Sequence, residues 1–319
     1  MSAPTFLESS GVLHSGPATF FGLELATAPS APTRLALVGA PWDEGNGGRH
    51  GANYGPRGVR DASSWFTSYD VRARRDVFEA LPAVDGGDLP CFPANAEGTM
   101  ASLAEGTGRL LDAGVRPLAV GGNHAITIGT AAGAARALGG RMGYLSIDTH
   151  LDTAADWGGS RYGSGCPTYR AAELENVDPA NVVVYGAHGW LNPREHVETA
   201  DELGVGWYSR EEILRRGLAE TLDEAIARAS DGVDGLYVTF DMDSIDSASA
   251  PGLGTPEAGG FVADEAIAIA RRIGQADPFA LDIVEIAPVY DPAGITPRLA
   301  CHLILEMIGG LAEADAGEV

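Results

Sequence analysis

Short apolar runs alternate with helix-like stretches along most of this chain, and this alternation restricts the possible folds more than any other feature. Each run spans four to seven residues and favours Val, Ile, Leu and Tyr, as strands buried on both faces of a parallel sheet do. The runs are Leu35–Gly39, Pro117–Val120, Met142–Ile147, Asn181–Tyr185, Gly235–Phe240 and Ala280–Ile286. The helix-like stretches between and after them are 98–113, 125–138, 210–229, 263–274 and 296–313. This order predicts an α/β fold of three layers, αβα, with a mainly parallel central sheet.

The beginning of the chain differs from this pattern. Residues 1 to about 30 are rich in Ser, Ala, Pro and Gly and run into the Pro-punctuated segment Ala28–Pro32. Large α/β folds of this length commonly form one domain. We therefore expect residues 1–32 to form an N-terminal arm and residues 33–319 to form a single α/β domain.

The charge balance disfavours several classes of partner. Acidic residues outnumber basic residues 44 to 21, which gives a formal charge of −23. Such a surface repels phosphate backbones and anionic lipid, so we expect no nucleic-acid and no membrane partner. We see no secretory signal and no apolar window of about 18 residues that would span a membrane. The three cysteines show no CxxC spacing, and we expect a reducing, cytoplasmic location.

Polar residues directly follow four of the predicted strands. Pro117–Val120 is followed by Gly-Gly-Asn-His, Met142–Ile147 by Asp-Thr-His-Leu-Asp, Gly235–Phe240 by Asp-Met-Asp and Ala280–Val284 by a glutamate. Ligands of open parallel sheets bind beyond the carboxyl ends of the strands. We therefore expect these polar side chains to meet in one site.

The polar residues at the strand ends include a set of metal-ligand types. In an extended segment, the alternating residues 148, 150 and 152 project to one side, and residues 241 and 243 share that spacing. Six ligands are too many for one ion with an open position, and four carboxylates cannot cluster without cations. Two divalent ions about 3.5–4 Å apart resolve both problems. The oxygen-rich donor set favours Mn²⁺, although Zn²⁺, Ni²⁺ and Fe²⁺ also bind such donors. The predicted ligands are His124, Asp148, His150, Asp152, Asp241 and Asp243.

Several separated motifs resemble those of the ureohydrolase (arginase and agmatinase) family, over residues 35 to 305. The most specific is TFDMDSIDSASAPGLGTP at 239–256, which is similar to the family signature SxDxDxxDPxxxPGxGxP. The motifs GAPWD, GANYGPR, DGGD and EIAPVYD, at 39–43, 51–57, 85–88 and 285–291, support it. The resemblance implies an arginase-like fold and a hydrolase that releases urea and an amine from a small cationic guanidino compound. It also implies a homo-oligomer, either a trimer or a hexamer.

The same resemblance implies roles for individual residues. His124, Asp148, Asp152 and Asp241 would hold one ion, and Asp148, His150, Asp241 and Asp243 the other. Glu285 would hydrogen-bond the planar guanidinium and orient it. Asp152 would accept a proton from the nucleophile as the tetrahedral intermediate forms.

Two positions depart from the family pattern. Asn123 stands before the His124 ligand where the family usually has Asp, which makes the site less negative. Ser164 stands before Gly165 where agmatinases and arginases usually have a His thought to relay protons to the departing amine. Asp152, Tyr162 or His188 could replace this donor, and we count Ser164 and His188 among the candidate substrate-binding residues.

These departures keep other functions open. Formiminoglutamases also resemble the chain and tend to have Ser-Gly at this place, so a formimino hydrolase that releases formamide is the main alternative. A catalytically impaired, metal-binding paralogue is a further alternative. A nucleophilic role for Cys166 is disfavoured, since no base partner is near it in the sequence. For the substrate tail, Arg161 could meet a carboxylate, whereas Asp156 or Glu195 could meet an amine.

Overall fold

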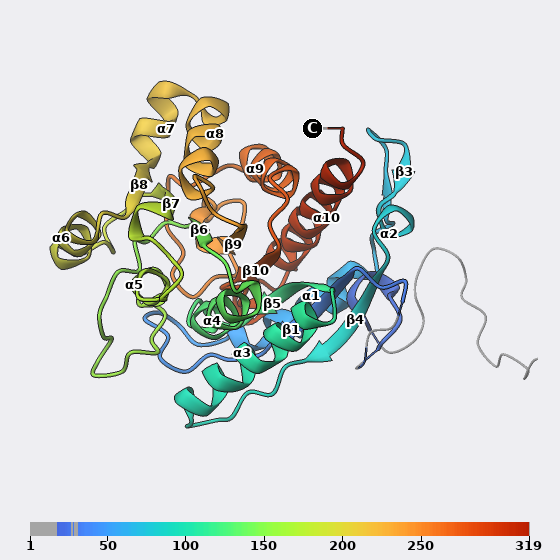
Figure 1. Ribbon diagram of the computed structural model, residues 1–319, viewed down its shortest axis with the longest axis horizontal. Helices are drawn as coiled ribbons and strands as arrows, with labels where there is room; N and C mark the ends of the chain where they lie inside the picture. Colours follow the sequence, from blue (N-terminus) through green and yellow to red (C-terminus); the bar gives the residue numbers. More distant parts are fainter. Residues whose placement is uncertain (1–17, 27, 29–30, 319) are drawn as a thin grey trace, which may run out of the picture.

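The computed structural model describes residues 18–26, 28 and 31–318. Within these residues an eight-stranded sheet, parallel throughout, lies between two layers of helices, which confirms the expected three-layer αβα fold (Figure 1). In their spatial order, the strands are β4 (Ala83–Asp88), β1 (Leu35–Ala40), β5 (Arg116–Gly121), β10 (Ala280–Val284), β9 (Gly235–Asp241), β6 (Met142–Ile147), β7 (Val182–Ala187) and β8 (Gly206–Ser209).

Helices connect the strands and pack on both faces of the sheet. They are α1 (Gly55–Ser63), α2 (Val77–Ala80), α3 (Ala96–Asp112), α4 (Ile126–Leu138), α5 (Pro167–Ala172), α6 (Arg194–Leu203), α7 (Arg210–Arg216), α8 (Leu218–Ala229), α9 (Ala263–Gln275) and α10 (Ile295–Asp315). A two-stranded hairpin of β2 (Tyr69–Asp70) and β3 (Arg75–Asp76) precedes α2.

The side chains of each central strand divide between two apolar layers. Leu35 and Leu37 of β1 belong to a cluster that includes residues of α1, α8, α9 and α10. Ala36 and Val38 belong to a separate cluster with residues of α3 and α4. Because successive side chains of a strand point to opposite faces, only a strand that is apolar throughout can pack on both helical layers. This explains the unbroken apolar runs in the sequence.

All six predicted strands are present in the eight-stranded sheet, but the sequence missed its other two strands, as well as the short strands β2 and β3. The β4 segment Ala83–Asp88 contains two glycines and two aspartates, and β8 has only four residues, so neither has the composition of a buried strand. The predicted helix 210–229 is two helices, since Gly217 interrupts it with a φ of 104°. Helices α1, α2, α5 and α6 were not predicted either.

Two further expectations concern the ends of the chain. Part of the expected arm lies outside the described residues, but Phe20 and Phe21 are buried and their N–H groups donate to Asp85 and Ser63 of the domain. At the other end, α10 is by length and composition alone long and apolar enough to cross a membrane, contrary to our expectation. Most of its apolar window, 72%, is buried inside the fold, as in the core helix of a globular domain.

Candidate active site

The order of the strands gathers the predicted site residues at one place. The neighbouring strands β5, β10, β9 and β6 are the four central strands of the sheet. His124 follows β5, Glu285 follows β10, and Asp241 ends β9. The segment with Asp148 follows β6. These strands are not consecutive along the chain, so the site is assembled by the sheet topology.

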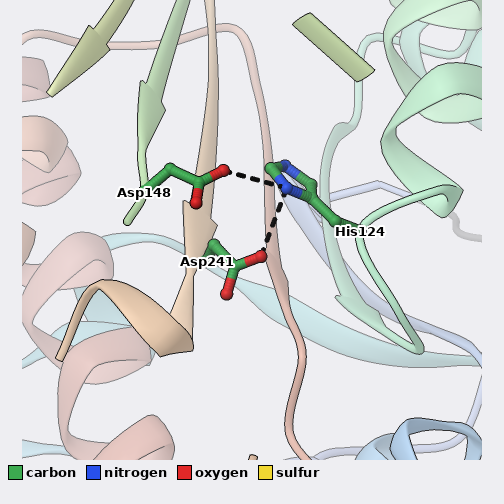
Figure 2. A group of neighbouring side chains, drawn as sticks. All are labelled: His124, Asp148 and Asp241. Carbon is green, nitrogen blue, oxygen red and sulfur yellow. Dashed lines mark ion pairs between the residues drawn. The ribbon is translucent and has the colours of Figure 1, made fainter. Parts of the chain in front are cut away.

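Two groups of possible metal ligands share one carboxylate. The first comprises His124, Asp148 and Asp241, which converge in Figure 2, and the second comprises Asp148, His150 and Asp243. The Nδ1 atom of His124 lies 3.1 Å from Asp148 Oδ2 and 3.2 Å from Asp241 Oδ2. It also lies 2.8 Å from Asp152 Oδ2. The six predicted ligands therefore lie together, as expected.

Turns rather than extended backbone direct the carboxylates inward. Asp148 accepts a hydrogen bond from the backbone N–H of His150 at 2.7 Å, and Asp241 accepts one from the N–H of Asp243 at 2.8 Å. Asp152 has a φ of 50°. The expectation of an extended segment after β6 is therefore wrong. Each Asp instead uses its own side chain to close a turn that brings the second residue to the same side.

Burial and mutual repulsion disfavour the charged forms of several carboxylates. Burial, followed by the charge of Asp152, raises the pKa of Asp148 to about 7. Burial together with the charge of Asp243 also raises the pKa of Asp241 well above its usual range. Cations that replace the lost solvation and offset the repulsion would relieve both effects.

The donor atoms fit such cations. His124 Nε2 lies 3.1 Å from Thr239 Oγ1, which leaves Nδ1 facing the carboxylates. Within the described residues, His124 Nδ1 and Asp243 Oδ1 are buried without a hydrogen-bond partner. Buried polar atoms normally have a partner, and imidazole nitrogen and carboxylate oxygen are both ligands of Mn²⁺ and similar ions. The residues present thus suit two divalent ions that share Asp148.

Glu285 lies beside this cluster in a strained conformation. Its φ is 64°, and its N–H donates to Gly122 O at 2.9 Å. Its Oε1 accepts the backbone N–H of His124 at 2.9 Å, whereas its buried Oε2 has no hydrogen-bond partner in the part of the chain described. Burial, together with the charge of Asp243, raises the pKa of Glu285 to about 8. One oxygen therefore anchors the side chain, and the other is available to a ligand.

A cavity opens over these residues. Ser164 lines it, and its Oγ accepts the N–H of Gly47 at 2.9 Å. His188, which we expected to contact substrate, is not among the lining residues, and its Nδ1 is 2.8 Å from Gly186 O. The lining residues are Asn46, Gly47, His124, His150, Asp152, Trp157, Ser164, Gly165, Leu191, His196, Asp241, Asp243, Thr255 and Glu285.

Three residues considered for the substrate tail lie elsewhere. Arg161 forms an ion pair with Glu173 at 2.9 Å and lines a different cavity. Asp156 accepts the N–H of Gly159 at 3.0 Å, and neither it nor Glu195 lines the site. Asp156 and Arg161 lie in the segment between β6 and α5, and Glu195 lies in the first turn of α6.

The sequence also missed several lining residues, among them His196, and considered a cysteine that does not line the site. His196 reaches the cavity from α6, a helix that the apolar pattern did not predict, so no sequence signal marked it. Burial raises the pKa of Cys166 to about 11, which keeps its thiol protonated near neutral pH. A thiol is a poor nucleophile, so this environment disfavours covalent catalysis by Cys166.

Comparison with known proteins places these features in context. Residues 33–309 match the Arginase family. The chain is 33% identical to the guanidinopropionase of Pseudomonas aeruginosa over 305 residues, which cover 95% of this chain and 94% of that protein. It is also 33% identical to the agmatinase of Sodalis glossinidius, with 85% of each chain covered. The structure of proclavaminate amidinohydrolase from Streptomyces clavuligerus superimposes with a TM-score of 0.86 at 29% identity, over 94% of this chain and 98% of that chain.

Proposed function

The chain belongs to the arginase family, and from this premise we propose that it hydrolyses a guanidino compound to urea and an amine. Its relatives in this family include enzymes that hydrolyse C–N bonds. One observation carries the proposal. Glu285, whose Oε2 has no hydrogen-bond partner in the described residues, lines the same cavity as members of both ligand groups, namely His124, Asp241, His150 and Asp243. A planar cation held by Glu285 would therefore lie against the site of the ions.

We propose Mn²⁺ for both ions, by the oxygen-rich donor set. His124, Asp148, Asp152 and Asp241 would hold one ion. Asp148, His150, Asp241 and Asp243 would hold the other. Such a pair, when bound, lowers the pKa of water, so that hydroxide is available near neutral pH.

The residues of the chain would then orient the substrate and move the proton. Glu285 would accept hydrogen bonds from the guanidinium at Oε2, since its Oε1 is held by His124. Asp152 would accept the proton of the nucleophile as the new carbon–oxygen bond forms, and deliver it to the amine nitrogen as the carbon–nitrogen bond breaks. Ser164, whose Oγ already accepts from Gly47, keeps its hydroxyl hydrogen for the substrate.

The pair Ser164 and Gly165 supports a second candidate, a formimino hydrolase. A formimino carbon carries a hydrogen in place of one guanidino nitrogen, so water addition would release formamide instead of urea. The products therefore distinguish the two functions.

Product analysis of the Mn²⁺-loaded protein tests the proposal. We expect urea from at least one compound of a panel of arginine, agmatine and guanidino acids, extended by alkylguanidines with an uncharged tail, and no formamide from formiminoglutamate. Asp148→Asn should lower the rate and the Mn²⁺ affinity by about 100-fold or more, because the residue belongs to both ligand groups.

The matched control is Asp223→Asn, which removes the same charge on exposed α8, where Asp223 pairs with Arg272 at 2.7 Å. It should leave rate and metal content unchanged. Formamide in place of urea would move the chain to the second candidate. If the protein with two bound metals released neither urea nor formamide, this result would contradict both candidate functions.

A further inference from the structure

The outer wall of the cavity lacks charged groups that could pair with a charged substrate tail. We define the outer wall as Asn46, Gly47, Trp157, Leu191 and His196. All four acidic side chains that line the cavity belong to the inner centre, as three proposed metal ligands and Glu285. In the described chain no arginine lines the cavity.

The nearby arginines have partners of their own. Arg161 pairs with Glu173, and Arg170 donates to Ala155 O at 2.9 Å. Arg49 donates to Leu253 O at 2.8 Å and stacks on a tyrosine ring. Moving any of them to a substrate carboxylate would break these contacts.

Trp157 forms one rigid side of the outer wall. A methyl group built on Gly47 would lie 2.9 Å from its indole, and one built on Gly165 would lie 2.8 Å away. Both distances are too short for ordinary contact, so the indole lies directly against these glycine backbones. This side of the wall is therefore aromatic, and it suits the methylene groups of a tail.

His196 adds one polar group to this wall. Only 8% of the residue is exposed, and its ring centroid lies 6.1 Å from that of Trp157. Its carbonyl accepts the hydroxyl of Thr153 at 2.6 Å, which anchors α6 beside the metal-ligand segment. Its Nδ1 is buried and has no hydrogen-bond partner within residues 18–26, 28 and 31–318. Burial lowers the pKa of His196, so the ring is neutral near neutral pH and can offer one donor and one acceptor.

We propose that Trp157 and His196 form a tail subsite that selects guanidino compounds with a short uncharged tail bearing a hydrogen-bonding group. The proposal rests on the proposed function and names its substrate class. A carboxylate or ammonium tail would lose its hydration in this wall without meeting an opposite charge, which costs free energy. A hydroxyl or amide tail would instead meet the neutral imidazole.

Four guanidines whose tails each contain three carbon atoms test this selectivity. They are 3-hydroxypropylguanidine, propylguanidine, 3-guanidinopropionate and 3-aminopropylguanidine. With the Mn²⁺-loaded protein, we expect kcat/KM for the hydroxyl compound to exceed that for each compound with a charged tail by about tenfold or more. Equal or faster turnover of either charged compound would overturn the proposal.

Substitutions distinguish a hydrogen bond between His196 and the substrate tail from a purely structural role of this residue. His196→Phe keeps an aromatic ring but removes the hydrogen bond. It should raise KM for 3-hydroxypropylguanidine by about threefold to tenfold and leave KM for propylguanidine unchanged. His196→Arg should shift the preference towards 3-guanidinopropionate. Equal effects of His196→Phe on the two compounds with uncharged tails would contradict the assigned contact.

His302→Phe on the exposed side of α10 is the matched control and should change neither KM. Failure of the proposed function gives a different result, because then no compound yields urea. Calorimetric dissociation constants of the same four compounds would still test the subsite. Tightest binding of the hydroxyl compound supports it, and equal or tighter binding of a charged compound overturns it.

Discussion

At the scale of single residues, a chain of buried hydrogen bonds holds the imidazole of His124 in its orientation. His124 Nε2 contacts Thr239 Oγ1 at 3.1 Å, and Thr239 Oγ1 lies 3.4 Å from Thr127 Oγ1. Thr127 in turn donates to the buried Asp282 at 2.8 Å. This chain of hydrogen bonds orients the imidazole and fixes which ring nitrogen faces the carboxylates.

Thr239→Val removes this support without changing the size of the side chain. We expect the affinity for Mn²⁺ to fall by about 10- to 100-fold, because the orientation of the imidazole is no longer held. Titration calorimetry of the metal-free protein measures it. Thr107→Val is the control, since Thr107 is also buried but its hydroxyl has no partner in the described structure. An unchanged affinity in Thr239→Val would show that the hydrogen bond does not orient His124.

At the scale of elements, one glycine divides what the apolar pattern predicts as a single helix. Gly217 has φ 104° and ψ 141°, a combination that residues with a Cβ strongly disfavour. This break lets α7 contact β7 and β8, while α8 packs along β6, β7 and β8. Helical propensity in the 210–229 segment is high on both sides, so the backbone conformation of one residue decides the packing.

Gly217→Ala should therefore destabilise the fold by about 2–3 kcal/mol, measured by urea unfolding. Gly139→Ala provides the comparison, since Gly139 ends α4 with φ 63° and a Cβ there would meet nothing within 4 Å. Its cost should be about 1 kcal/mol, from the left-handed conformation alone. If the two substitutions cost the same, the break at Gly217 is not specially strained.

At the scale of the whole molecule, the fold buries a cluster of carboxyl groups in its interior. The pKa of Asp148 is raised by burial to about 7, and that of Glu285 to about 8. In the unfolded chain these groups would titrate near their ordinary values of about 4. At a pH at which the unfolded chain has released these protons but the folded protein still holds them, folding requires proton uptake. The metal-free protein is therefore less stable there than at low pH.

The direction of these pKa shifts determines how the stability of the metal-free protein changes with pH. A carboxyl whose pKa is raised on folding contributes full stability below its unfolded pKa and loses it as pH rises through the folded pKa. His124 and His150, whose pKa values are also raised because neighbouring carboxylates outweigh burial, act in the same direction.

We thus expect the Tm of the metal-free protein to fall by about 5 °C or more between pH 5.5 and pH 8.5. Scanning calorimetry measures it, and added Mn²⁺ should reverse the fall, because a bound cation favours the deprotonated carboxylates. A Tm that rises over this range without metal would contradict the clustering of buried carboxylates.

Much of this architecture could be predicted from the order of the residues. Buried parallel strands need apolar side chains on both faces, which made β1, β5, β6, β7, β9 and β10 visible in the sequence. Ligands of such sheets bind beyond the carboxyl ends of the strands, which led to the prediction that the six candidate metal ligands and Glu285 lie at one site. The trimer or hexamer and the cytoplasmic location stay predictions.

What the sequence by itself determined was therefore the fold class and the positions of the inner-centre residues, because burial on two faces and a place directly after a buried strand leave few choices of residue type. Only the tertiary structure decided the outer wall of the cavity. His196 comes from a separate helix, His188 stays outside the lining, and Arg161 turns to Glu173. The physical reason is that loop and helix packing, rather than a local residue pattern, decides which side chains reach a cavity.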